Sequence, residues 1–426
     1  MAKTINLNHL TKVEGHANLT ISIKDSTIEK CELDSAEGSR YFEALLKDRN
    51  CLEAPEITSR ICGICSCAHF MASVQAVERA LGVKVTEQTK MLRELLMTGE
   101  RIRSHSTHLY FLALPDYLGF DNALEMTKKH RKDIEISLRL NKLGNGMVEL
   151  IGGRVMHPVS AQVGGFLKIP TQEEIDNLRR LLQDAQADAL ETARRFAKLK
   201  VPKFEKDTEY FSVYDDTAYG MLHGSMASQE NKFKQDEYQK YLSEYHVYYA
   251  TAKFVSKKDK PYMVGALSRM NNSYKFLSKN AKKVISEAKV KFPLNNPFMI
   301  NFCQAVELVH YVDRAIEICR KLKVKQEDPV PVEFRKGRGI SAVEAPRGVL
   351  WHDYEVNAKG EIIKANIITP TCQNLHNMEE DIKAYLPALL KLPENKLVLE
   401  VEKLIRAYDP CFSCSTHFLK VKWEKK

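Results

Sequence analysis

Apolar side chains recur at steps of three, four and seven residues along several long stretches, which is the period of an amphipathic helix. Four stretches carry this pattern: residues 90–114, 171–198, 298–322 and 397–408. The second follows a Thr-Gln-Glu-Glu capping box, and the fourth ends at an Asp-Pro break. The first is expected to end at Pro115. Helices that need one another's apolar faces predict a central helical bundle.

Shorter elements are predicted around this bundle. Residues 5–35 alternate between apolar and polar side chains as strands do, and residues 41–46 read as a short helix. A helix is predicted from about Ala68 to Leu81, with a glycine stop. Residues 200–260 are polar, rich in lysine and tyrosine, and carry few periodic signals. We therefore predict a multidomain α+β fold, mainly α, with small mixed α/β elements around a central bundle of long helices.

Composition excludes several classes of function. The 64 basic and 55 acidic residues are interspersed, so the net charge of +9 is a mild bias that does not indicate nucleic-acid binding. No stretch approaches the about 18 uninterrupted apolar residues of a membrane span, and no signal-type apolar block follows Met1. We expect a cytoplasmic protein with no membrane span. No Walker-type loop and no Gly-x-Gly-x-x-Gly after a strand is found.

Two Cys-x-x-Cys pairs carry the main chemical signal. Cys62 and Cys65 lie near one end of the chain, Cys411 and Cys414 lie near the other, and a histidine follows each pair within four residues. Four thiolates at this spacing could hold one metal or a compact cluster. Zinc is the commonest occupant of paired Cys-x-x-Cys sites, but zinc modules usually draw ligands from a short span. The wide separation favours a centre buried within a large domain.

The remaining cysteines are scattered singly, which suits a reducing compartment better than a disulfide scaffold. No further Cys-x-x-Cys set could hold an iron-sulfur relay. If the protein does redox chemistry, its electrons must leave through a partner.

The two cysteine motifs resemble those of the large, catalytic subunit of nickel-iron hydrogenases. Residues 60–65 read Arg-Ile-Cys-Gly-Ile-Cys, and residues 409–417 read Asp-Pro-Cys-Phe-Ser-Cys-Ser-Thr-His. Three further stretches support the resemblance in chain order: residues 11–16 (Thr-Lys-Val-Glu-Gly-His), residues 152–165 with their Gly-Gly-Arg, His-Pro and Gly-Gly steps, and residues 344–348 (Glu-Ala-Pro-Arg-Gly). The resemblance covers essentially the whole chain.

The resemblance implies the reaction H2 ⇌ 2H+ + 2e− at a nickel-iron centre. It places Cys62 and Cys411 as terminal ligands of nickel, and Cys65 and Cys414 as bridges to an iron that carries carbon monoxide and cyanide. Glu14 would exchange protons with a metal-bound thiolate, that of Cys411. A carboxyl group in a dry site can have its pKa raised towards the range that a proton shuttle needs.

Other residues would shape the pocket. The resemblance places Pro346 and Arg347 above the diatomic ligands of iron, with the guanidinium donating to a cyanide nitrogen. Asp409 would orient Arg347, and Asp116 would contact an arginine beside the metals. His69 is interpreted either as a donor to a bridging sulfur or as a core histidine with its hydrogen bonds satisfied.

A second ion is also implied. Glu43 and His417 would bind Mg2+, or Fe2+, together with the backbone carbonyl of Leu375. Family members are made as precursors, and a maturation endopeptidase cuts their tail after the last histidine. Here that tail would be residues 418–426. Residues 1–417 would form one large-subunit domain: an N-terminal α+β part (1–60), a helical core with the motifs (61–200 and 296–417), and a peripheral insertion (201–295).

Electrons would pass to an iron-sulfur small subunit, and then to flavin- and iron-sulfur-containing subunits that react with NADP or NAD. A deazaflavin-linked or heterodisulfide-reductase-linked hydrogenase is the nearest alternative. Two interpretations of another class are a zinc-stapled scaffold and a non-catalytic subunit of the same fold, as in respiratory complex I. The latter lacks the four cysteines that this chain contains.

Overall fold

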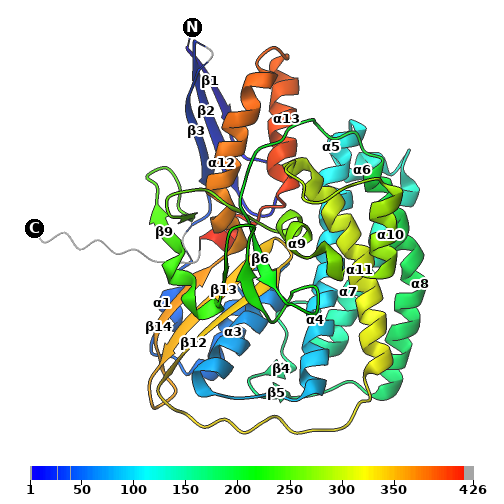
Figure 1. Cartoon of the computed structure of the whole chain (residues 1–426), viewed down its shortest axis with the longest axis vertical. Coiled ribbons are helices and arrows are strands. Elements are labelled where there is room, and N and C mark those ends of the chain that lie inside the picture. The colour runs from blue at the N-terminus through cyan, green and yellow to red at the C-terminus, as the bar shows by residue number, and fades with distance from the viewer. Residues whose placement is uncertain (1, 26, 39, 417–426) are drawn as a thin grey trace, which may run out of the picture.

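The computed structural model describes residues 2–25, 27–38 and 40–416. The predicted metal ligand His417 and the predicted tail 418–426 lie outside the described residues. Figure 1 shows long helices gathered on one side of the molecule, with small sheets and further helices on the other. The predicted mainly α, α+β architecture is therefore confirmed.

The helical side contains α4 (Glu87–Thr107), α7 (Arg131–Gly152), α8 (Gln172–Ala197), α10 (Lys279–Glu287) and α11 (Ile300–Lys321). Helix α4 packs against α7 and α11, and α11 packs against α8 (Figure 1). The capping box predicted for α8 is present: Thr171 Oγ1 accepts from the Glu174 amide at 3.2 Å, and Glu174 accepts from the Thr171 amide at 2.7 Å.

The helix predicted to stop at Pro115 continues beyond it, so that prediction is wrong. After α4 the chain forms a π-helical segment, η2 (His108–Ala113), and then α5 (Leu114–Leu118). Pro115 lies in the first turn of α5, where a missing amide donor costs no helical hydrogen bond. Helix α5 ends at Gly119, which has a φ of 76°.

The strands form several small sheets. The N-terminal sheet contains β1 (Ala2–Leu7), β2 (Ala17–Lys24) and β3 (Thr27–Ser35), paired antiparallel in that order. The C-terminal sheet contains β12 (Gly337–Ala345), β13 (Gly348–Val356) and β14 (Ile362–Ile368). Another sheet has the order β11 (Met263–Val264), β6 (Tyr210–Tyr214), β7 (Ser225–Ala227) and β8 (Lys232–Phe233). Two-stranded ribbons pair β4 (Ala161–Gln162) with β5 (Gly165–Phe166), and β9 (Leu242–His246) with β10 (Lys253–Lys257).

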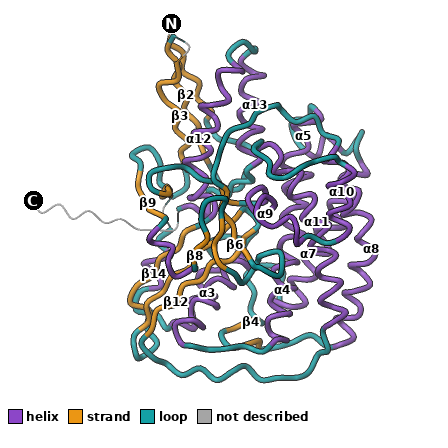
Figure 2. The backbone as a smooth tube through the Cα atoms, in the orientation of Figure 1, coloured by secondary structure: helices purple, strands orange, loops and turns teal. Residues whose placement is uncertain are grey.

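Shorter helices connect these parts (Figure 2). They are α1 (Phe42–Leu46), α2 (Ala54–Ser59), α3 (Ser66–Leu81), α6 (Ala123–Met126), α9 (Ala266–Ser273), α12 (Pro370–Leu389) and α13 (Glu394–Ala407). The 3-10 turns are η1 (Cys51–Glu53), η3 (Gln235–Lys240), η4 (Tyr274–Phe276), η5 (Pro297–Met299) and η6 (Ser413–Ser415). No helix in the described ranges combines the length and the apolar character that crossing a bilayer requires.

Residues 201–295 were expected to form a peripheral insertion, and the structure corrects this for several of their elements. Strand β6 is largely buried, and α9 buries most of its residues. Phe211 and Val213 of β6 share a core cluster with Trp351 of β13. Because these strands have only two to five residues, they leave no detectable period in the sequence.

Four distant parts of the chain meet at one place. Helix α3 packs against β12 and β13, so that the cysteines before α3 lie beside the β12–β13 hairpin. Glu14 forms a parallel bridge with Cys411, which follows α13. The fold thereby brings both ends of the described chain to the hairpin.

Candidate metal centre

The four predicted cysteine ligands converge. The sulfurs of Cys62, Cys65, Cys411 and Cys414 all lie within 4.8 Å of one another, and the side chains are buried. Cys62 Sγ is 3.7 Å from Cys411 Sγ, Cys65 Sγ is 3.5 Å from Cys414 Sγ, and the sulfurs of Cys411 and Cys414 are 2.6 Å apart. Residues 349 positions apart in the chain thus present their sulfurs to one point.

Local structure explains the first pair. Cys62 lies in the turn after α2, and Cys65 caps α3, with its amide donating to Cys62 Sγ at 3.3 Å. Hydrogen bonds from the other three thiols lower the pKa of Cys62 well below its ordinary value. Burial raises the pKa of Cys411 and Cys414. Four thiolates could share this dry place only with cations among them, so the donor set fits soft metal ions.

The second pair is held by backbone contacts from other segments. The Cys411 amide donates to Thr371 Oγ1 at 2.9 Å, and the Phe412 amide donates to the carbonyl oxygen of Glu14 at 2.9 Å. Arg40 Nη2 donates to the carbonyl oxygen of Ile61 at 2.6 Å and also contacts that of Ser413. Sequence reasoning did not identify Arg40, which ties one cysteine motif to the other.

The structure places Glu14 beside Cys411, as predicted. Cys411 Sγ donates to Glu14 Oε2 at 2.8 Å. Ser413 Oγ lies 2.6 Å from both carboxylate oxygens of Glu14. Sequence reasoning missed Ser413, although a hydroxyl inside a Cys-x-x-Cys loop was the available signal. Glu14 is only partly buried, so its carboxyl group reaches both the sulfur and the molecular surface.

Arg347 is buried at the turn of the β12–β13 hairpin and pairs with Asp409. Its Nη2 donates to Asp409 Oδ1 at 2.9 Å, and its Nε donates to the Asp409 carbonyl oxygen at 2.6 Å. Burial opposes the charge on Arg347, but Asp409 and the cysteines raise the pKa of the guanidinium. Its buried Nη1 has no hydrogen-bond partner in the described part of the chain. A buried donor without a partner fits an acceptor on a bound group.

Two further predicted residues lie in buried networks. His69 is buried, and its Nδ1 is 3.3 Å from His352 Nε2. Asp116 Oδ2 accepts from Arg406 Nη1 at 2.8 Å, and Lys12 also contacts this carboxylate. The arginine that Asp116 contacts is therefore Arg406.

The second predicted ion site is partly described. Glu43 accepts from the Ile367 amide at 2.9 Å, and both its oxygens lie 3.4 Å from Lys253 Nζ. Lys253 is also 3.1 Å from Glu244. Burial raises the pKa of Glu43 although Lys253 opposes the shift. Two carboxylates facing one ammonium leave an excess of negative charge, which fits a hard cation. Leu375 is buried in α12.

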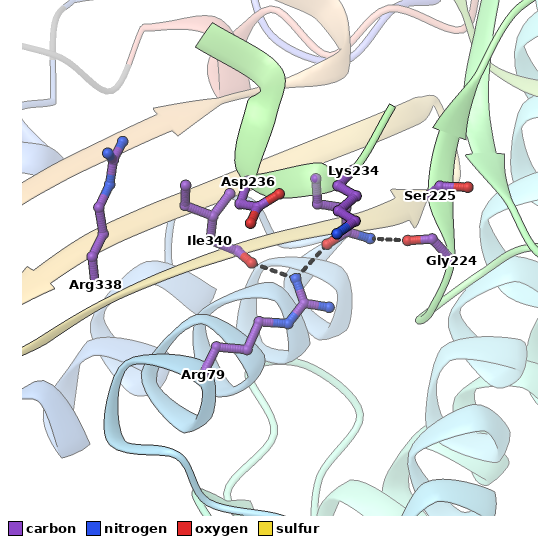
Figure 3. Close-up of a pocket in the computed structure, with 8 residues that line it drawn as sticks. Arg79, Gly224, Ser225, Lys234, Asp236, Arg338 and Ile340 are labelled. Atoms are coloured by element: carbon purple, nitrogen blue, oxygen red, sulfur yellow. Dashed lines mark hydrogen bonds between the residues drawn. The ribbon is translucent and has the colours of Figure 1, made fainter. Parts of the chain in front are cut away.

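A separate pocket of about 480 Å³ opens beside β12 (Figure 3). Arg79 points into it and contacts Gln235 and the carbonyl oxygen of Ile340, and Lys234 and Arg338 complete a basic lining. None of its lining residues belongs to the cysteine cluster.

Comparisons with known proteins agree with the site. The family profile described as nickel-dependent hydrogenase matches residues 40–168 and 187–417. The alpha subunit of sulfhydrogenase 1 from Pyrococcus furiosus is 36% identical over 424 residues, covering 98% of each chain. A subunit of the F420-non-reducing hydrogenase vhc from Methanococcus voltae is 30% identical, covering 97% of this chain and 94% of that protein.

Among solved structures, an NAD+-reducing [NiFe]-hydrogenase in the H2-reduced state superposes with a TM-score of 0.84 at 25% identity. The match covers 97% of this chain and 99% of the other. The similarity therefore extends over the whole architecture as well as the cysteine motifs.

Proposed function

The chain belongs to the nickel-dependent hydrogenase family, and from this premise we propose that its four-cysteine cluster carries out the reaction H2 ⇌ 2H+ + 2e−. The observation that carries the proposal is the meeting of four sulfurs within 4.8 Å, with the Glu14 carboxylate 2.8 Å from Cys411 Sγ. A zinc scaffold would not need that carboxylate, and a metal-free subunit would not need the four sulfurs.

Cys62 and Cys411 hold nickel, and Cys65 and Cys414 hold both nickel and iron. When bound, the two metals supply a Lewis acid and an electron acceptor for the heterolytic cleavage of H2. Arg347 Nη1, beside Pro346, donates to a cyanide ligand of iron, and Asp409 fixes the guanidinium in that direction. Carbon monoxide completes the iron ligands.

The protein's own groups move the proton. Cys411 Sγ holds it, and Glu14 Oε2 accepts it across 2.8 Å. Ser413 Oγ fixes the carboxylate in this position through its contacts to both oxygens. Because Glu14 is partly exposed, it can release the proton towards solvent.

Further residues support the centre. Glu43, His417 and the carbonyl group of Leu375 bind Mg2+ or Fe2+, and an endopeptidase removes residues 418–426 after nickel is inserted. Asp116 and His69 hold the surroundings of the cluster. His417 and the tail lie outside the described residues, so for them this step rests on the sequence motif.

Electrons leave through an iron-sulfur small subunit, which passes them to flavin-containing subunits that reduce NADP or NAD in the cytoplasm. The similarity to sulfhydrogenase alpha subunits and to an NAD+-reducing hydrogenase supports this choice. The alternative is a deazaflavin-linked or heterodisulfide-reductase-linked complex, since F420-non-reducing hydrogenase subunits are similar over nearly the whole chain.

Metal analysis of the complex purified without oxygen tests the proposal. We expect one nickel for each copy of this chain, together with H2-dependent reduction of a dye. Zinc without nickel would support the scaffold instead, and the absence of metal would support the complex I-like subunit. The chains that copurify, and a comparison of NADP+, NAD+ and F420 as acceptors, distinguish the two kinds of hydrogenase.

A further inference from the structure

Arg269 of α9 is a fully buried arginine that sequence reasoning did not identify; its side chain is 1% exposed. Its Nε and Nη2 donate to the two carboxylate oxygens of Glu307 at 2.6 and 2.7 Å, and its Nη1 donates to Glu344 at 2.9 Å. The remaining donors reach two backbone carbonyl oxygens, those of Ala345 at 3.2 Å and Pro346 at 3.1 Å. The five N–H groups of the guanidinium thus all have acceptors.

Neighbouring groups fix the two carboxylates that hold Arg269. Glu344 accepts from the Val213 amide at 2.7 Å. Glu307 accepts from Tyr219 Oη at 2.7 Å and lies 2.9 Å from His105 Nε2. Burial lowers the pKa of His105 to about 4, so this histidine is neutral near pH 7 and does not displace Arg269. Arg269 therefore has one well-defined position.

The two carbonyl groups that Arg269 binds immediately precede Arg347. Ala345 pairs with Gly348 in the β12–β13 hairpin, so Pro346 and Arg347 form its two-residue turn. Helix α9 also approaches this turn at its N-terminus: a Cβ atom on Gly265 would lie 3.1 Å from the Arg347 carbonyl oxygen. Helix α9 thus contacts the turn both before and at Arg347.

We infer that Arg269 is a positioning residue, which fixes the Pro346–Arg347 turn so that Arg347 Nη1 points into the metal pocket. Asp409 binds the side chain of Arg347, whereas Arg269 binds the backbone that carries it. Hydrogen bonds from a charged donor are each worth about 1.5–3 kcal/mol, so two of them can hold a short turn in one conformation. The inference rests on the proposed function, because the group that Arg347 faces is the iron's cyanide.

The Arg269→Lys variant of the whole complex tests this inference. Lysine keeps the positive charge but cannot serve the five acceptors at once. We expect nickel content at the wild-type level, shifted infrared stretching bands of the cyanide ligands, and a kcat about 10- to 100-fold lower, as small displacements of positioned groups produce. Unshifted cyanide bands in a nickel-loaded variant would overturn the inference.

Three companions sharpen the test. Arg269→Lys should cause no further band shift when Arg347 is already lysine, because its effect passes through Arg347. Tyr219→Phe removes a hydrogen bond from the same buried network without touching the turn, and should leave the bands unchanged. If Arg269→Lys fails to fold, Glu344→Gln keeps the shape and weakens only one partner of Arg269; a smaller shift is then expected, and unshifted bands would again contradict the inference.

A crystal structure of the variant complex locates Arg347 independently of turnover. Displacement of the Arg347 guanidinium supports the inference, and an unmoved turn overturns it. Failure of the proposed function would differ, since the wild-type complex itself would then lack nickel and H2 turnover.

Discussion

Glu14 belongs to a contact in which each partner limits the freedom of the other. Its backbone pairs with the cysteine turn, its Oε2 accepts from Cys411 Sγ at 2.8 Å, and Ser413 contacts both carboxylate oxygens at 2.6 Å. The carboxylate is therefore held within the reach that direct proton transfer requires. This contact makes Glu14 the carboxylate through which a proton on Cys411 can leave the cluster.

Replacing Glu14 by glutamine tests this role. The amide keeps the size of the side chain and an acceptor oxygen, but it cannot carry a proton at neutral pH. We expect H2/D+ exchange to fall by about 100- to 10,000-fold, the usual contribution of a general acid-base group, with nickel content unchanged. Exchange at the wild-type rate would remove Glu14 from the proton path. Glu53→Gln, an exposed glutamate on η1, is the matched control.

At the scale of elements, local signals predicted those structures whose causes are local. The capping box at Thr171 and the glycine at position 82 gave the start of α8 and the end of α3. The π-helical turn of residues 108–113 could not be predicted in this way, because Pro115 has the same local signature at a helix end and in the first turn of a new helix.

The site shows the same division. Cysteine spacing predicted the four sulfurs, and the motif around Glu14 predicted its place beside Cys411. Arg269 could not be predicted, because its partners Glu307 and Glu344 lie 38 and 75 residues further along the chain. A lone arginine in a polar segment is normally exposed, and only tertiary packing shows that this one is buried.

Helix α12 carries two adjacent glutamates whose pKa values shift in opposite directions. Burial raises the pKa of Glu379 to about 7, although the Leu33 amide and Tyr249 donate to its carboxylate. For Glu380 burial is opposed and outweighed by Lys383, which lowers the pKa. The folded state therefore binds the Glu379 proton more tightly than the unfolded state, so its contribution to stability falls as pH rises from about 4.5 to 7.

Replacing Glu379 by glutamine should abolish this dependence. Glutamine keeps an acceptor for the Leu33 amide but carries no charge, so we expect the free energy of unfolding at pH 8 to rise by about 1–3 kcal/mol, with little change at pH 4.5. Calorimetry of the purified chain at both pH values checks this. Glu380→Gln is the control with the opposite sign, since it should lower the Tm at pH 8. Equal destabilisation of Glu379→Gln at both pH values would contradict the argument.

At the scale of the whole molecule, the metal centre depends on joining two segments that lie 349 residues apart. Arg40 makes this connection directly, because its guanidinium binds the carbonyl group before Cys62 and the carbonyl group before Cys414. Its own amide donates to the Thr416 carbonyl oxygen at 2.7 Å, so the contact also holds the end of the described chain. Glu14 and Thr371 also bind the cysteine turn, but neither of them belongs to the first cysteine motif.

Arg40→Met should therefore loosen the second cysteine pair from the first while leaving all four sulfurs in place. Loss of hydrogen bonds from a charged donor costs about 1.5–3 kcal/mol, which corresponds to about a 10- to 100-fold faster loss of nickel to a chelator. Nickel release from the purified complex in EDTA, followed by atomic emission, measures this rate. Arg49→Met is the control, because Arg49 is an exposed arginine with only a distant ion pair to Glu53. Equal nickel release from the Arg40 variant and the wild type would show that Glu14 and Thr371 suffice to hold the C-terminal cysteines against the first pair.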